Sequence, residues 1–119
     1  AAASVEDAGE AGRFAPCGLT LDRVGSFARA GIAWAAPSSP PPGLVAANRA
    51  LVRALAERGI ETEARAWRPH VTLARRCTRA IDGPLDPPVA WDATRLVLMS
   101  SRLLSEGPRY REVAGWDAR

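Results

Sequence analysis

The only histidine of the 119-residue chain, His70, is followed two places later by a threonine. If this stretch is a strand, side chains alternate between its two faces, so that His70 and Thr72 share one face. Val71 and Leu73 would then point to the other face, towards a core. An imidazole moves a proton near neutral pH, and a hydroxyl can hydrogen-bond a phosphate oxygen. The pair is therefore suited to one half of a phosphoryl-transfer site.

Positive charge gathers around this histidine. Residues 65 to 79 hold five arginines and no acidic residue. Two of them, Arg75 and Arg76, close the stretch and would add fixed charge with fork-shaped donors. Such a cluster suits a phosphate-bearing ligand. A solvated basic face explains the charge equally well, so the charge alone does not separate the two interpretations.

Residues 68 to 75 read Arg-Pro-His-Val-Thr-Leu-Ala-Arg. This octapeptide resembles the second His-x-Thr motif of the two-histidine phosphoesterases, and among them the 2′-5′ RNA ligase family, also called RNA 2′,3′-cyclic phosphodiesterases. That family reads Arg-Pro-His-x-Thr-Leu-x-Arg at this point. The resemblance extends over roughly residues 14 to 116, through an Ile-x-Trp segment, a Leu-rich helix closed by glycine, and Leu-x-Ser-x-Leu and Gly-x-x-Tyr segments near the C-terminus.

The resemblance implies an enzyme, a hydrolase, that opens an RNA 2′,3′-cyclic phosphate to a 2′-phosphate, or makes a 2′-5′ linkage in reverse, without a metal or other cofactor. It makes His70 and Thr72 catalytic and gives the phosphate to Arg75, with Arg76 as the substitute. Strict alternation places Arg76, not Arg75, on the face of His70. A β-bulge or the strand end near Ala74 would bring Arg75 to that face.

Family members carry two such motifs, and one histidine acts as general base while the other acts as general acid. This chain has one histidine, so it resembles a member truncated at its N-terminus. The expected partners are an RNA or nucleotide with a 2′,3′-cyclic phosphate, and the missing N-terminal segment or a second subunit. A non-catalytic RNA- or nucleotide-binding module and a structural fragment are the alternatives.

The pattern predicts an α+β fold with a mainly antiparallel sheet and one main helix, similar to the C-terminal part of the bilobal phosphoesterase fold. Residues 1–13 are expected to be a helix end, stopping near Gly9 or Gly12, or a linker, and residues 14–119 a partial domain. The spacing of Leu44, Asn48, Leu51, Val52 and Leu55 predicts an apolar stripe on a helix over 44–58. Strands are expected over 16–24, 32–35, 68–75, 91–100 and 110–116, with turns over 25–31, 82–88 and 101–108.

The composition excludes some other classes of protein. No apolar run approaches the 18 residues of a membrane span. Cys17 and Cys77 have no metal-ligand spacing, and one histidine cannot complete a common zinc set. We expect both to be reduced thiols of a cytoplasmic protein.

Overall fold

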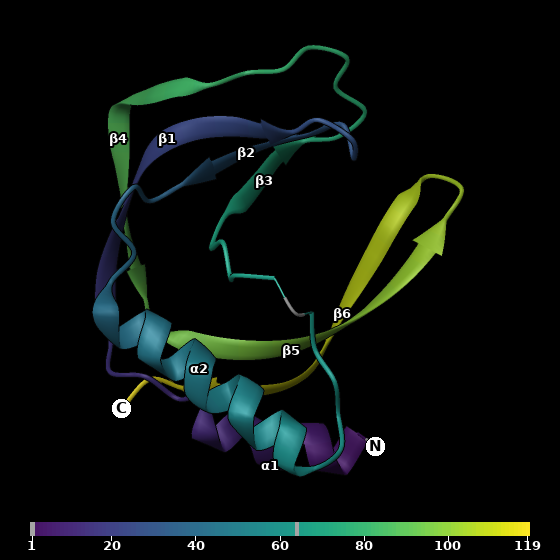
Figure 1. The fold of residues 1–119 in the computed structure, drawn as a ribbon. Helices are drawn as coiled ribbons and strands as arrows, with labels where there is room; N and C mark the ends of the chain where they lie inside the picture. Colours follow the sequence, from purple (N-terminus) through teal and green to yellow (C-terminus); the bar gives the residue numbers. More distant parts are fainter. Residues whose placement is uncertain (1, 64) are drawn as a thin grey trace. The chain divides into compact units, whose positions relative to one another are not determined.

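The computed structural model describes residues 2–63 and 65–119. The chain divides into two compact units. Figure 1 shows the ribbon of the whole chain, coloured along the sequence. The sheet unit comprises residues 18–41 and 65–92, and the helical unit comprises the described parts of 1–17, 42–64 and 93–119. The elements are α1 (Ala2–Ala11), β1 (Cys17–Phe27), β2 (Ile32–Ala36), α2 (Pro42–Glu57), β3 (Val71–Ala74), β4 (Gly83–Ala93), β5 (Arg95–Leu104) and β6 (Gly107–Asp117).

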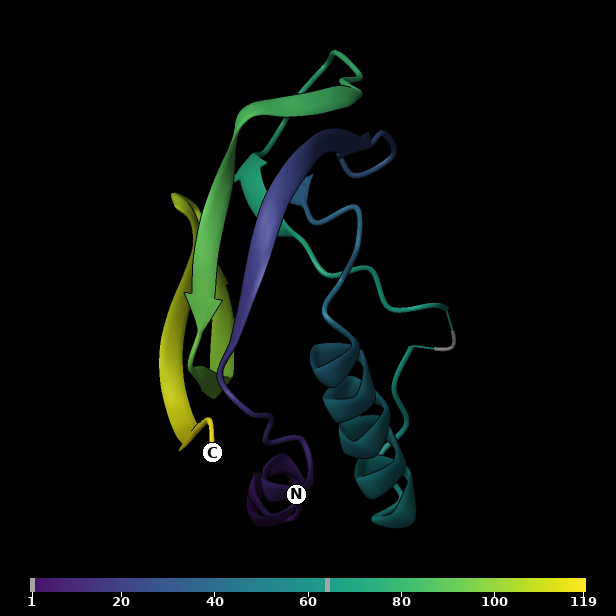
Figure 2. The same ribbon diagram turned by 90° about the vertical axis from the view of Figure 1, so that its left-hand side faces the viewer.

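The sheet unit is built on a hairpin. β1 and β2 pair antiparallel, β3 adds antiparallel to β2, and β4 adds to β1, which gives the order β3-β2-β1-β4. Figure 2 shows β4 running beside β1. Leu19 and Leu21 are buried on one face of β1, as their alternation predicted. β1 continues to Phe27, beyond the predicted end, because Gly25 to Phe27 still pair with β2.

The proline-rich segment 82–88 was predicted to turn, and this prediction is wrong. β4 runs through Pro84, Pro87 and Pro88, with a cis peptide bond before Pro87. Proline lacks the N–H that a central strand must donate, but β4 lies at the edge of the sheet, where that loss is tolerated. The strand predicted over 91–100 is also two strands, since β4 ends at Ala93 and β5 begins at Arg95.

The main helix of the helical unit is α2, close to its predicted range. Proline is tolerated in a first helical turn, and Gly59 ends the helix with a positive φ of 75°. The Ile60 N–H donates to the Leu55 carbonyl at 2.9 Å, which closes the C-terminal turn. The predicted stripe is only partly right: Ala47 and Ala54 are the buried residues of α2, whereas Val52 is exposed.

The first residues form a helix, α1, which packs against α2 and the β5–β6 hairpin. Gly9 does not stop this helix, which continues to Ala11 beside Gly12. A Cβ atom at Gly9 would overlap the ring of Trp116 in β6. Gly9 therefore leaves room for an indole, a contact that local sequence patterns do not indicate because the two residues are far apart in the chain.

We predict that Gly9→Ala destabilises the protein although alanine is the better helix former. The overlap with Trp116 should cost about 1–3 kcal/mol, more than the roughly 0.5–1 kcal/mol that alanine normally adds over glycine inside a helix. Gly43→Ala in α2 is the matched control, because nothing lies within 4 Å of its Cβ position. Urea unfolding of both variants measures the difference. Equal stabilisation by the two substitutions would contradict the contact.

The β5–β6 hairpin turns more tightly than predicted. Its strands pair from Arg95 with Asp117 to Leu104 with Gly107, so that only residues 105 and 106 connect them. Gly107 has a φ of 120°, which favours glycine at this position. The apolar run of β5 was predicted to be covered on both faces, but Met99 is 46 % exposed.

Candidate functional site

The strand of the His-x-Thr motif is shorter than predicted. β3 begins at Val71, so His70 is the residue before it, and Thr72 lies opposite Trp34 of β2. Trp34 and Ala33 are consecutive residues of β2, but their partners on β3 are Thr72 and Ala74. Leu73 is therefore the extra residue of a β-bulge. Leu73 is 56 % exposed, and the prediction that it points into a core is wrong for this reason.

Both features that were expected near Ala74 are present, since the register shifts at Leu73 and β3 ends at Ala74. The bulge shifts the alternation of side chains within β3 by one residue, but the regular alternation does not extend to Arg75 and Arg76, which follow the strand. Arg76, two residues after the end of β3, has a positive φ of 58°. Its neighbour Cys77 donates its N–H to the carbonyl of Gly31 at 2.8 Å and so ties this end of β3 to the β1–β2 turn.

The imidazole of His70 is exposed but held by two contacts. Its Nδ1 lies 2.7 Å from the backbone carbonyl oxygen of Arg68. A carbonyl oxygen can only accept, so Nδ1 carries the hydrogen of the neutral ring and Nε2 keeps a free lone pair. The ring of Phe27 stands edge to face with the imidazole, at a centroid distance of 5.0 Å and an interplanar angle of 88°. The arrangement leaves Nε2 as the atom that can exchange a proton with a ligand.

His70 lines a pocket of about 340 Å³ within the sheet unit. That size lies near the lower end of the range for small-molecule sites, and it suits one nucleotide better than a long strand. Aromatic rings, prolines and two arginines form its wall. The lining residues are Arg23, Phe27, Trp34, Ala36, Pro37, Ser38, Pro40, Trp67, Arg68, Pro69 and His70.

The predicted site residues are not all part of this wall. His70 lines the pocket, whereas Thr72, Arg75 and Arg76 are absent from the lining. Arg23 and Arg68 lie there instead. Arg68 belongs to the motif, two residues before the histidine, so the sequence could have predicted its place in the pocket. No sequence pattern pointed to Arg23, because only the pairing of the strands brings β1 to the histidine.

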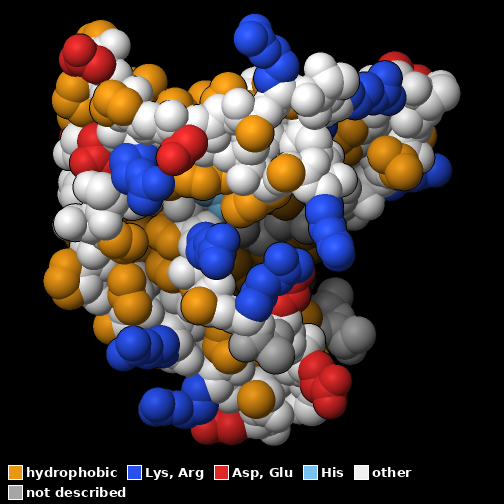
Figure 3. All heavy atoms as spheres, turned by 45° about the horizontal axis from the view of Figure 1, so that its top comes forward, with side chains coloured by type: hydrophobic (Ala, Val, Ile, Leu, Met, Phe, Trp, Pro, Cys, Tyr) orange, Lys and Arg blue, Asp and Glu red, His pale blue; other side chains and the backbone are white. Residues whose placement is uncertain are grey.

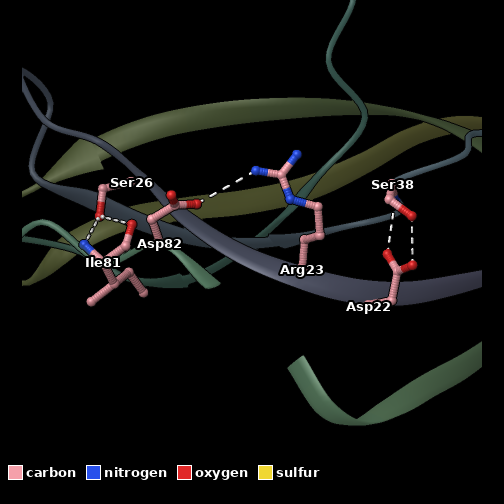
Figure 4. Close-up of polar contacts among 6 residues, drawn as sticks. All are labelled: Asp22, Arg23, Ser26, Ser38, Ile81 and Asp82. Carbon is pink, nitrogen blue, oxygen red and sulfur yellow. Dashed lines mark hydrogen bonds and ion pairs between the residues drawn. The ribbon is translucent and has the colours of Figure 1, made fainter. Parts of the chain in front are cut away.

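A carboxylate holds the rim of the pocket. Asp22 of β1 accepts hydrogen bonds from the backbone N–H of Ser38 at 2.7 Å and from its hydroxyl at 2.6 Å (Figure 4). Ser38 lies between Pro37 and Pro40, which line the pocket, so this contact fastens the rim to the sheet. The side-chain hydrogen bond from Ser38, followed by the backbone one, lowers the pKa of Asp22 below its usual 3.8.

This lowered pKa predicts a pH dependence. A carboxyl group whose pKa is lower in the folded state stabilises the fold above its unfolded pKa, and this stabilisation is lost as the pH falls through the folded pKa. We therefore expect Asp22→Asn to flatten the loss of stability below about pH 4. Thermal unfolding between pH 5 and pH 2 measures how the stability of each protein depends on pH, and Asp92→Asn in the same sheet is the control. Parallel curves for wild type and Asp22→Asn would contradict the prediction.

A second set of contacts fixes β1 to the segment before β4. The Arg23 guanidinium lies 3.5 Å from a carboxylate oxygen of Asp82, and the Ile81 N–H donates to the Ser26 hydroxyl at 2.8 Å (Figure 4). The ion pair between Arg23 and Asp82 is exposed and weak.

Arginine side chains also stand out among hydrophobic ones on the face drawn in Figure 3.

The described ranges, 2–63 and 65–119, hold neither a metal cluster nor a membrane-spanning helix. No group of three or more His, Cys, Asp or Glu side chains in them could hold a metal ion. No helix in them is both long and apolar enough to cross a membrane. Both cysteines are free thiols.

Residues 2–103 match the sequence model of the 2′-5′ RNA ligase superfamily. The chain belongs to this superfamily. It is 31 % identical over 100 residues to the RNA 2′,3′-cyclic phosphodiesterase of Escherichia coli K12, a match that covers 82 % of this chain and 56 % of that enzyme. The chain therefore spans little more than half the length of this curated relative. The resemblance seen in the octapeptide and its flanks is confirmed.

Solved structures show the same fold. A phosphoesterase crystal structure matches with a TM-score of 0.84 at 24 % identity, and E. coli LigT, solved with 3′-AMP, with 0.83 at 24 %; each match covers 99 % of this chain and 70 % of the other. Protein TT0787 of Thermus thermophilus matches with 0.78 at 22 % identity, over 98 % of this chain and 69 % of its own. The predicted α+β class with antiparallel sheets is thus confirmed.

Proposed function

We propose that this chain carries one half of the active site of an RNA 2′,3′-cyclic phosphodiesterase. The observation that carries the proposal is the His70 imidazole, which lines a nucleotide-sized pocket with Nε2 free for proton transfer. The similarity to the E. coli phosphodiesterase supports the same substrate class. The substrate would be an RNA end or nucleotide with a 2′,3′-cyclic phosphate, and the product a 2′-phosphate.

Hydrolysis of the ring needs two proton movements. Water attacks phosphorus and loses a proton, the bond from phosphorus to the 3′ oxygen breaks, and that oxygen gains a proton. A neutral imidazole can accept the proton from water, and an imidazolium can donate a proton to the 3′ oxygen. We assign one of these two transfers to His70 Nε2. The other proton carrier would come from a further segment or a second subunit, since the chain has one histidine.

Hydroxyl and guanidinium groups would hold the phosphate. We assign Thr72 as the hydroxyl donor and Arg75 as the principal cation, with Arg76 as its substitute. Arg68 and Arg23 line the pocket itself and add charge-assisted donors there. We also propose a cytoplasmic location, which the two free thiols support.

Incubation with cytidine 2′,3′-cyclic phosphate, followed by chromatographic separation of the products, tests the proposal. We expect cytidine 2′-phosphate to accumulate and the 3′ isomer to stay at the level of uncatalysed hydrolysis. Arg102→Gln, an exposed arginine of the helical unit, is the control variant and should keep the wild-type rate. Binding without turnover would indicate a binding module instead, and accumulation of the 3′ isomer would overturn the assigned bond cleavage.

A further inference from the structure

The contacts around His70 continue into the sheet through two aromatic rings. Phe27, the last residue of β1, contacts the imidazole edge to face. Phe27 also packs against Trp34 of β2, with ring centroids 5.8 Å apart and an interplanar angle of 42°. His70 lies outside the regular pairing of β3, so these rings connect it to the central hairpin of the sheet.

The position of Trp34 is itself determined by a glycine. Gly25 lies directly opposite Trp34 in the β1–β2 register, and a Cβ atom there would overlap the indole ring. The indole N–H is buried and has no hydrogen-bond partner within the described residues. Packing on Gly25, and not a hydrogen bond, therefore holds the indole in place.

We propose that Phe27 is a positioning residue for His70, in a series of contacts from Gly25 through Trp34 and Phe27 to the imidazole. The Arg68 carbonyl fixes which nitrogen carries the hydrogen, and a single hydrogen bond still lets the ring swing about it. The Phe27 ring restricts that swing and so sets the direction of the Nε2 lone pair. A small misplacement of a catalytic group can cost up to about a hundredfold in rate.

Two properties of the contact distinguish positioning from ordinary packing. Phe27 is only half-buried, so it contributes less to the core than a fully buried ring does. Its contact with the imidazole is specific in geometry, near 90° between the planes. The proposal rests on the proposed function only for its catalytic consequence, since the contact between the Phe27 ring and the imidazole is measurable without turnover.

The experiment uses the imidazole resonances of the chain, which come from a single histidine. Proton NMR of the free 119-residue protein reports the ring current of Phe27 on the imidazole protons. We expect Phe27→Leu to move these resonances towards those of a solvent-exposed histidine, and Phe27→Tyr, which keeps the ring, to leave them near wild type. Phe14→Leu, the same change at a buried position of the helical unit, should leave them unmoved.

Turnover of cytidine 2′,3′-cyclic phosphate gives the second readout. We expect Phe27→Leu to lower kcat about ten- to a hundredfold with little change in KM, and Phe27→Tyr to restore it. Imidazole resonances that are the same in wild type and Phe27→Leu would overturn the proposal, as would an equal loss of kcat in Phe14→Leu. If wild type shows no turnover, the resonances still report whether Phe27 contacts the imidazole, because this readout does not need the other half of the active site.

Discussion

Replacing His70 by alanine is expected to lower the turnover of a nucleoside 2′,3′-cyclic phosphate by about 10²–10⁴-fold, the usual loss when one proton-transfer group is removed. The imidazole is exposed, and His70 lies immediately before the edge strand β3, so the fold should survive. Steady-state kinetics and a thermal melt measure the two effects. A change in stability within about 0.5 kcal/mol is expected, as for other surface positions.

A His70→Gln variant refines this prediction. Glutamine keeps a polar side chain near the Arg68 carbonyl but does not titrate near neutral pH. We expect it to bind a nucleotide about as well as wild type while turnover falls as in His70→Ala. Turnover in either variant close to that of wild type would remove His70 from the mechanism. Arg102→Gln serves again as the control.

Replacing Gly25 by alanine is expected to have the largest effect among substitutions that do not touch His70. The added methyl group would overlap the Trp34 indole, and overpacking of this kind costs about 1–3 kcal/mol. Moving the indole should also release Phe27 and, through it, the imidazole. Urea unfolding and the kcat of the variant measure the two consequences.

Gly83→Ala is the matched control, because this glycine also lies in a strand but nothing is within 4 Å of its Cβ position. It should leave both the free energy of unfolding and kcat close to wild type. If Gly25→Ala were as stable and as active as Gly83→Ala, the packing of Trp34 on Gly25 would have no role in the site.

Local patterns predicted most of the elements. The alternation of Leu19 and Leu21 placed β1, and the glycine at 59 placed the end of α2. The motif around His70 predicted the family, and the conflict over Arg75 and Arg76 pointed to the bulge that the register shows. These features depend on residues close in sequence, or on a motif whose order alone is informative.

The features that were predicted wrongly, or not at all, depend on contacts between residues that are distant in the sequence. The prolines of β4 were predicted to mark a turn. Proline is tolerated in a strand at the edge of a sheet, and only the order of the strands shows that β4 is an edge strand. Ala47 and Ala54 carry no strong hydrophobic signal, yet they are the buried residues of α2. The pocket wall could not be predicted either, since Arg23 reaches it through strand pairing and Phe27 was expected in a turn.

The most direct test of the site is a titration of the single imidazole with cytidine 2′-phosphate, the expected product. In proton NMR, we predict that the His70 resonances shift progressively and saturate, and that Arg68→Gln, which changes the pocket wall beside them, weakens the binding. Cytidine 2′,3′-cyclic phosphate should compete for the same site. Saturable binding of the nucleotide with unmoved imidazole resonances would place the ligand elsewhere and contradict the assignment of His70.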